Sequence, residues 1–198
     1  MPDRLEVTKT YKLFIDGKFP RSESGRTLVV NQTRGTGKAR SLVVYAHVCH
    51  ASRKDLRDAV SAARKALPGW RSATAYLRGQ ILYRMAEMME GKADELAAAV
   101  SVTGTSAASA NNEVAAAIDR VVSFAGWADK YQQVLGCNNP VAGPYYNFTV
   151  PEPTGVVAVV SPDEPSLLGL ISLVAPAICA GNTVVVLASE ANPIPAAV

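Results

Sequence analysis

Residues 154–187 read TGVVAVVSPDEPSLLGLISLVAPAICAGNTVVVL and carry the strongest structural signal in the chain. Two continuous apolar, β-branched runs, 154–160 and 183–187, predict strands, and the apolar stretch 166–179 between them predicts a helix. Strand, helix and strand in this order form the βαβ pattern, and continuous apolar strands are typical of a parallel sheet that is covered on both faces. The sequence therefore predicts an α/β fold that binds ligands at the loops after the two strands.

Composition excludes several classes of protein. The chain has 198 residues, of which 48% are hydrophobic, and a net charge of +3, so it can bury a core and is not of the basic nucleic-acid-binding type. Its cysteines, Cys49, Cys137 and Cys179, are far apart, which is ordinary for a reducing compartment. Residues 1–12 are charged, and no apolar run reaches the roughly 20 residues that a bilayer requires. We therefore expect a cytoplasmic protein with no nucleic-acid or membrane partner.

The amino-terminal part predicts a small antiparallel element. Asp16-Gly17 lies between two runs of alternating apolar and polar residues, 12–15 and 27–30, and is a typical hairpin signal. Residues 31–40 read NQTRGTGKAR and predict a polar loop, and residues 41–48 predict a further strand.

Neither a phosphate-binding loop nor a metal site is expected in this part. Lys38 lacks the glycine spacing of a phosphate-binding motif. His47 and Cys49 share one face of the predicted strand, but two candidate ligands without a second pair do not form a metal site. We expect these residues to be structural.

Four stretches with helical periodicity follow, with predicted ranges 52–67, 73–90, 92–102 and 112–133. Ser52 and Asp55 predict a capping box at the start of the first helix, and Pro68-Gly69 predicts its end. Residues 103–110 predict a break. The residues predicted to be buried in the second and fourth helices are Leu77, Ile81, Met85, Met88 and Met89, and Val114, Ile118, Val121, Val122, Ala125 and Ala128.

The last residues predict the opening of a helix. Asn192 can cap it, and Pro193 suits its first position. Isolated helices of about two turns are marginal. We therefore expect the chain to stop within an element, as a fragment would.

Several segments recur in an order and spacing that chance does not explain: Phe14-Ile15-Asp16-Gly17, Trp70, the FAGWADK run at 124–130, Glu152-Pro153-Thr154-Gly155-Val156-Val157, Ala175-Pro176-Ala177, and the AGNTVV run at 180–185. Together they resemble the aldehyde dehydrogenase superfamily over most of the chain. The resemblance implies a Rossmann-type cofactor domain, with residues 1–136 as its amino-terminal hairpin and helical part. Residues 137–151 would form an oligomerisation strand segment, and residues 152–198 the first, incomplete βαβ unit. A homo- or hetero-oligomer with an aldehyde dehydrogenase is also implied.

The resemblance further implies oxidation of an aldehyde to a carboxylic acid with NAD or NADP. In the family a cysteine thiolate attacks the carbonyl, a hydride passes to nicotinamide, and a glutamate activates the hydrolytic water. Both residues lie beyond position 198 in the family, and Cys49, Cys137 and Cys179 do not match the nucleophile's position. We therefore expect no catalytic residue in this chain.

In an open parallel sheet ligands bind beyond the carboxyl ends of the strands, so we expect the cofactor at the loops 161–165 and 188–192. The implied cofactor-binding residues are Val160, Ser161, Pro162, Asp163, Leu187, Ser189 and Glu190. Glu164 stands where the family has the Asn whose amide donates to the oxyanion. Loss of that donor costs about 3 to 4 kcal/mol, and repulsion by a carboxylate adds on the order of 4 kcal/mol. Together these effects predict a rate lower by roughly five orders of magnitude.

A second departure concerns the cofactor's adenosine. Leu187 replaces a family lysine that contacts the ribose, whereas the partner glutamate is kept as Glu190. We therefore expect weak NAD binding or none. Alternatively, Leu187 merely ends a buried strand and Glu190 is solvated.

Two interpretations of function follow from the resemblance. The chain is the amino-terminal part of a working NAD(P)-dependent aldehyde dehydrogenase, or it is a degenerate, non-catalytic copy that scaffolds an active relative. Family membership favours the first, and the two departures favour the second. A nucleophilic cysteine and a base glutamate downstream of Val198 would distinguish them.

Overall fold

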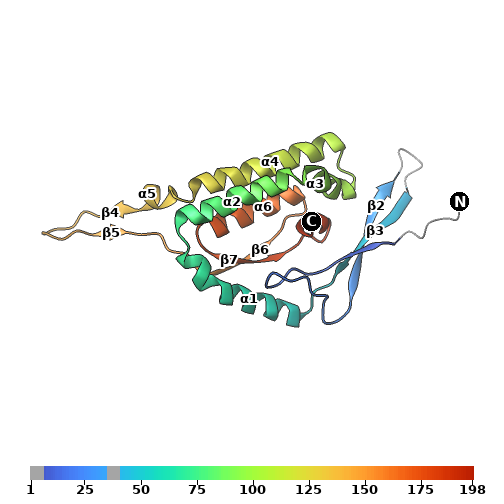
Figure 1. Ribbon diagram of the computed structural model, residues 1–198, viewed down its shortest axis with the longest axis horizontal. Coiled ribbons are helices and arrows are strands. Elements are labelled where there is room, and N and C mark those ends of the chain that lie inside the picture. Colours follow the sequence, from blue (N-terminus) through green and yellow to red (C-terminus); the bar gives the residue numbers. More distant parts are fainter. Residues whose placement is uncertain (1–6, 35–40) are drawn as a thin grey trace.

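The computed structural model describes residues 7–34 and 41–198. Figure 1 shows a layer of helices on one side of a parallel strand pair, a small sheet at one end of the molecule and a ribbon at the other. The elements are β1 (Lys9–Tyr11), β2 (Thr27–Arg34), β3 (Ser41–Cys49), α1 (Arg53–Ser72), α2 (Ala75–Glu90), α3 (Ala93–Val100), η2 (Ser101–Thr103), α4 (Ala107–Trp127), α5 (Tyr131–Leu135), β4 (Cys137–Asn138), β5 (Phe148–Thr149), β6 (Val156–Val160), α6 (Ser166–Cys179), β7 (Thr183–Leu187) and η3 (Ile194–Ala196).

The predicted βαβ unit is confirmed. β6 and β7 pair in parallel from Val156 opposite Thr183 to Val160 opposite Leu187, and α6 connects them. One face packs on α6, while the other meets α1, where the Thr183 hydroxyl donates to the Ala63 carbonyl at 3.0 Å. The expectation of a sheet covered on both faces is wrong at its carboxyl end. Val160 is 68% exposed and Leu187 is 62% exposed, whereas Thr183, at the start of β7, contacts α1.

The amino-terminal sheet has the strand order β1-β3-β2. The tight turn at Asp16-Gly17 is confirmed, with positive φ angles of 53° and 71° and a bridge between Ile15 and Lys18. However, the run at 27–30 is not the partner across this turn, because β2 pairs antiparallel with β3. Residues 31–34 extend β2 and are not part of a loop. Lys38 lies outside the described residues.

The helix α1 does not end at Pro68-Gly69, as predicted, but continues to Ser72. Pro68 has no N–H to donate to the carbonyl of Arg64, four residues earlier. Arg64 lies on the exposed side of the helix, where water can bind to this carbonyl instead. The last turn is held by long-range contacts. The Trp70 indole N–H donates to the Ile178 carbonyl at 2.9 Å, and Arg71 pairs with Glu152 at 2.8 Å. Tertiary packing therefore overrides the stop signal.

The helices α2, α4 and α6 share the main core, but the buried side of α2 differs from the prediction. Leu77, Ile81 and Met88 are exposed. The residues that face the core are Arg78, Gly79, Leu82, Ala86 and Met89. Gly79 lets α2 approach α4 closely, since a Cβ there would lie 3.1 Å from the Ala125 carbonyl oxygen. Gly79 and Arg78 therefore lie on the buried side of α2, where a hydrophobicity pattern predicts larger apolar residues.

The helix α4 begins at Ala107, before the predicted position 112, because Ser106 caps it. The Ser106 hydroxyl accepts from the Ser109 N–H at 3.2 Å, and the alanines that follow favour a helix. The helix ends at Trp127, and α5 follows as a separate turn. Val114, Val121, Ala125 and Ala128 are buried as predicted, whereas Val122 is 39% exposed.

Residues 137–150, within the segment expected to form an oligomerisation strand (137–151), form a projecting two-stranded ribbon. β4 pairs antiparallel with β5, Cys137 opposite Thr149 and Asn138 opposite Phe148. The ribbon leaves the body of the molecule beyond α5 (Figure 1), and all of its residues are exposed. Within residues 7–34 and 41–198, no helix is both long and apolar enough to cross a membrane.

Candidate functional site

The two strands of the βαβ unit end side by side. The Ser161 N–H donates to the Leu187 carbonyl at 2.9 Å, which extends the ladder by one step beyond β6. The loops 161–165 and 188–192 therefore begin at the same edge of the strand pair, which we call the carboxyl edge. It brings together the implied cofactor-binding residues Val160, Ser161 and Leu187.

Hydrogen bonds join the two loops at this edge. The Ser189 hydroxyl donates to Asp163 Oδ1 at 2.7 Å and accepts from the Asn192 N–H at 3.0 Å. The Asn192 amide group donates to the carbonyls of Ala99 and Val100, at 3.1 and 3.3 Å. Asp163 itself is exposed, whereas Ser189 and Asn192 are buried.

The expectation that Asn192 caps a helix is wrong. Its side chain is buried against the end of α3, and η3 starts after it as a short 3-10 turn without a side-chain cap. The sequence does not indicate this linking role, because Asn before Pro is an ordinary helix-capping signal.

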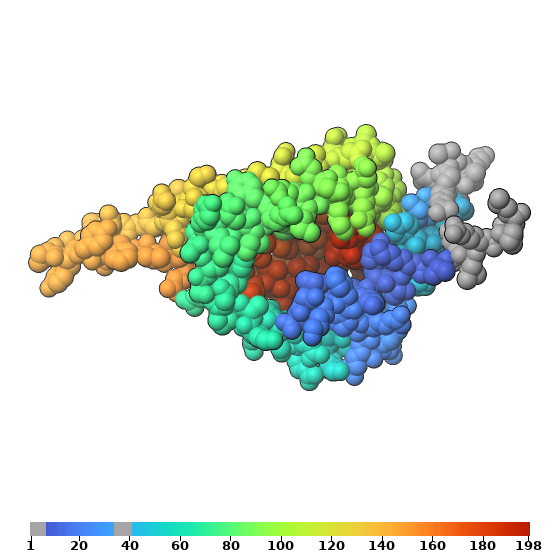
Figure 2. Space-filling model, in the orientation of Figure 1, coloured from blue at the N-terminus to red at the C-terminus, as the bar shows by residue number. Residues whose placement is uncertain are grey.

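The surface of the carboxyl edge combines apolar and acidic groups. Val160 and Leu187 share one face of the strand pair and are largely exposed, so Leu187 does not end a buried strand. Pro162 is half-buried, and Glu164 and Glu190 are exposed. Of the side chains that the structure describes, Ser161 Oγ and Asn192 Oδ1 are buried polar atoms without a hydrogen-bond partner. Figure 2 shows α6 and β7, in red, at the bottom of a hollow between the helices and the amino-terminal part.

These residues fit the adenosine part of a dinucleotide. Exposed Val160 and Leu187 offer an apolar surface to a purine base, and the Glu190 carboxylate can accept hydrogen bonds from ribose hydroxyls. They do not fit its diphosphate. The two loops contain Asp163, Glu164 and Glu190 but no lysine or arginine, so their charge repels an anion.

The amino terminus of α6 is already occupied by a carboxylate. Glu113 of α4 accepts from the N–H groups of Leu167 and Leu168 through Oε1, at 2.7 and 3.2 Å. It replaces the missing side-chain cap of this helix, whose cap residue is Pro165. The helix end is therefore not available to a phosphate. The sequence carries no local signal for this contact, because Glu113 lies on a distant helix.

The three cysteines lie on three separate elements. Cys179 is buried, its thiol donates to the Phe124 carbonyl at 3.2 Å, and burial raises its pKa. Cys137 lies on the exposed β4–β5 ribbon, far from the carboxyl edge in Figure 1, and Cys49 ends β3. In the described part of the chain, no three His, Cys, Asp or Glu side chains are grouped to hold a metal ion.

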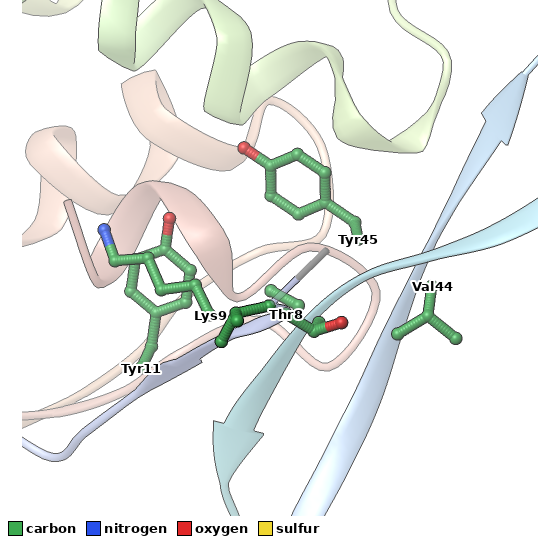
Figure 3. Close-up of a pocket in the computed structure, with 7 residues that line it drawn as sticks. Thr8, Lys9, Tyr11, Val44 and Tyr45 are labelled. Carbon is green, nitrogen blue, oxygen red and sulfur yellow. The ribbon is translucent and has the colours of Figure 1, made fainter. Parts of the chain in front are cut away.

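An open cavity of about 250 Å³ lies on the amino-terminal sheet (Figure 3). Its lining residues are Val7, Thr8, Lys9, Tyr11, Val44, Tyr45 and Ala46. Lys9 Nζ lies 4.2 Å from the centre of the Tyr11 ring, and burial together with Tyr11 raises the pKa of Tyr45. No residue of the carboxyl edge lines this cavity, so it is separate from the candidate site.

Comparisons with known proteins converge on one family. The family described as "Aldehyde dehydrogenase family" matches residues 36–198. The chain is 33% identical to an aldehyde dehydrogenase of Aspergillus niger over 98% of its own length and 37% of that protein's. Among solved structures, PnpE in complex with nicotinamide adenine dinucleotide is similar, with a TM-score of 0.84 and 31% identity over 94% of this chain and 37% of that one.

A third similar protein is the G224D mutant of aldehyde dehydrogenase from Bacillus cereus. Its TM-score is 0.87 at 28% identity, over 95% of this chain and 37% of that one. The chain therefore spans well under half the length of the relatives that it matches.

Proposed function

Because the chain belongs to the aldehyde dehydrogenase family, we propose that it supplies the adenosine-binding edge of the cofactor domain in an NAD-dependent aldehyde dehydrogenase. The observation that carries this proposal is the convergence of Val160, Leu187 and Glu190 at the carboxyl edge. The family's solved members include complexes with NAD, which supports this choice of nucleotide.

In this proposal the residues of the chain hold the cofactor and perform no chemistry. NAD, when bound, would supply the hydride acceptor for aldehyde oxidation. Val160 and Leu187 would contact the adenine, and Glu190 would accept from the ribose. Glu190 also disfavours a phosphate on that ribose by charge, so NAD is preferred to NADP. The resemblance to the family places the thiolate and the general base that oxidation requires beyond position 198, so we expect this chain to supply neither.

We further propose that the β4–β5 ribbon mediates oligomerisation and that the protein is cytoplasmic. The ribbon carries exposed apolar residues that another chain can cover, namely Tyr145, Tyr146, Phe148 and Val150. An open two-stranded ribbon also offers unpaired strand edges to a partner. Nothing in the comparisons favours the alternative of a non-catalytic scaffold.

Titration of the isotopically labelled chain with NAD, followed by NMR, tests the adenosine site. We expect chemical-shift changes confined to residues 158–163 and 185–191, matched by adenosine and absent with nicotinamide mononucleotide. Glu190→Gln should weaken the binding, whereas Glu87→Gln, an exposed carboxylate on α2, should not. Shift changes elsewhere, or none with NAD, would contradict the proposal.

A further inference from the structure

One buried hydroxyl connects the two loops of the carboxyl edge. Ser189 is 5% exposed, and its Oγ both donates to Asp163 in the loop after β6 and accepts from the Asn192 N–H in the loop after β7. We propose that Ser189 is a positioning residue that sets the separation of the two nucleotide-binding loops. This inference rests on the proposed function and identifies how that site is held in place.

The hydroxyl is part of a continuous chain of hydrogen bonds. From the exposed carboxylate of Asp163 the chain passes through Ser189 to Asn192, which is 3% exposed. Asn192 is in turn fixed to the last carbonyls of α3, Ala99 and Val100. The exposed end of this series of hydrogen bonds, Asp163, is therefore connected to the buried carboxyl end of α3.

The implied nucleotide-binding residues lie close in sequence to the bonded groups. Val160 precedes Asp163 by three positions, and Leu187 and Glu190 flank Ser189. Because the Asp163–Ser189 bond joins the loops at these points, it fixes the apolar surface and the Glu190 carboxylate relative to each other. Strand pairing already holds Val160 and Leu187 opposite each other. The Asp163–Ser189 hydrogen bond therefore positions only the residues beyond the ends of β6 and β7.

The bond between the loops does not require the charge of Asp163. A hydrogen bond to a carboxylate is stronger than one to an amide, but Asn at position 163 keeps an acceptor oxygen for the Ser189 hydroxyl. Ala at position 163 removes the acceptor. Ala at position 189 removes the donor to Asp163 and also leaves the Asn192 N–H without its partner. Comparison of the three substitutions therefore distinguishes the effect of the hydrogen bond between the loops from the effect of the charge at position 163.

The experiment compares Ser189→Ala, Asp163→Ala and Asp163→Asn in the full 198-residue chain. Ser172→Ala is the matched control, since it removes a part-buried hydroxyl on α6 that donates to the Leu168 carbonyl and touches neither loop. Amide hydrogen exchange at Asn192, without nucleotide, should be on the order of tenfold faster in Ser189→Ala and unchanged in Ser172→Ala. The dissociation constant for adenosine, which has no diphosphate for Asp163 to repel, should rise on the order of tenfold in Ser189→Ala and Asp163→Ala, and Asp163→Asn should restore most of the affinity.

The outcomes distinguish this inference from the proposed function. If the unmodified chain does not bind NAD, the proposed function and the positioning role fail together. If it binds NAD and Ser189→Ala binds adenosine as tightly as the unmodified chain does, the positioning role alone is overturned. The positioning role is also overturned if Ser172→Ala loses as much affinity as Ser189→Ala, because the effect is then one of general stability, which the melting temperatures of both variants will report.

Discussion

Asp55 shows how one side chain can start a helix and anchor a distant segment. Its carboxylate accepts from the Ser52 N–H at 2.7 Å, which completes the predicted capping box of α1, and from the Ser22 hydroxyl at 2.7 Å. These hydrogen bonds lower the pKa of Asp55 from 3.8 to about 2. The sequence predicts the capping box, but not the contact with Ser22, which lies 33 positions away.

Asp55→Ala should destabilise the folded chain by about 1 to 2 kcal/mol at neutral pH, as expected for a lost helix cap. The pKa of Asp55 is lower in the folded state, so its contribution is complete above about pH 4 and is lost as the pH falls toward 2. Urea unfolding between pH 7 and pH 2 should therefore show a smaller loss of stability on acidification in Asp55→Ala than in the unmodified chain. Asp58→Ala, which removes the exposed neighbouring carboxylate, should keep the full pH dependence.

The thiol of Cys179 should be unreactive in the folded protein. Burial raises its pKa, and its hydrogen bond to the Phe124 carbonyl further protects it. Mass spectrometry after treatment with an alkylating reagent should show rapid modification of exposed Cys137 and modification of Cys179 only after denaturant is added. Rapid labelling of Cys179 in the native Cys137→Ser variant would contradict its assignment as a core residue.

At the scale of elements, the start of α6 depends on a residue from another helix. Glu113 caps its first N–H groups, where the negative carboxylate also suits the positive end of the helix dipole. Glu113→Ala should lower the free energy of unfolding by about 1 to 2 kcal/mol, measured by urea denaturation. Glu113→Gln keeps an acceptor and should lose less. Glu87→Ala, which breaks an exposed pair with Arg84, should change stability by less than about 0.5 kcal/mol.

The elements also show where sequence patterns succeed and fail. The continuous apolar runs and the Asp16-Gly17 turn predict β6, α6, β7 and the tight turn correctly, because their signals are local. The extension of α1 beyond Pro68 and the burial of Gly79 depend on contacts with α6 and α4, and no local pattern reports those contacts. The same difference between local signals and long-range contacts determines how much of the candidate site the sequence predicts. Its location at the strand ends follows from the βαβ pattern, whereas the Asp163–Ser189–Asn192 connection requires the folded loops.

At the scale of the whole molecule, the chain combines an intact helical layer with a strand pair that is open at its carboxyl end. Apolar residues are exposed there and along the β4–β5 ribbon. The motifs from Trp70 onward that resemble the aldehyde dehydrogenases lie within the family match over residues 36–198, so membership of the family could be predicted from the sequence. The chain alone should produce no NADH from NAD and common aldehydes, because Cys179 is buried and neither Cys49 nor Cys137 matches the position of the family's nucleophile. Absorbance at the NADH maximum measures this directly, and NADH formation by the purified chain would contradict it.

The proposed function implies an affinity for NAD that calorimetry can measure most directly. The carboxyl edge fits adenosine, but its three carboxylates repel the diphosphate, so the 198-residue chain should bind NAD with a dissociation constant in the millimolar range, about 4 kcal/mol of binding free energy. Free adenosine should bind more tightly than NAD, because it lacks the diphosphate that these carboxylates repel. A micromolar dissociation constant for NAD would contradict the proposed function, since the two loops of the carboxyl edge contain no positively charged side chain to offset that repulsion.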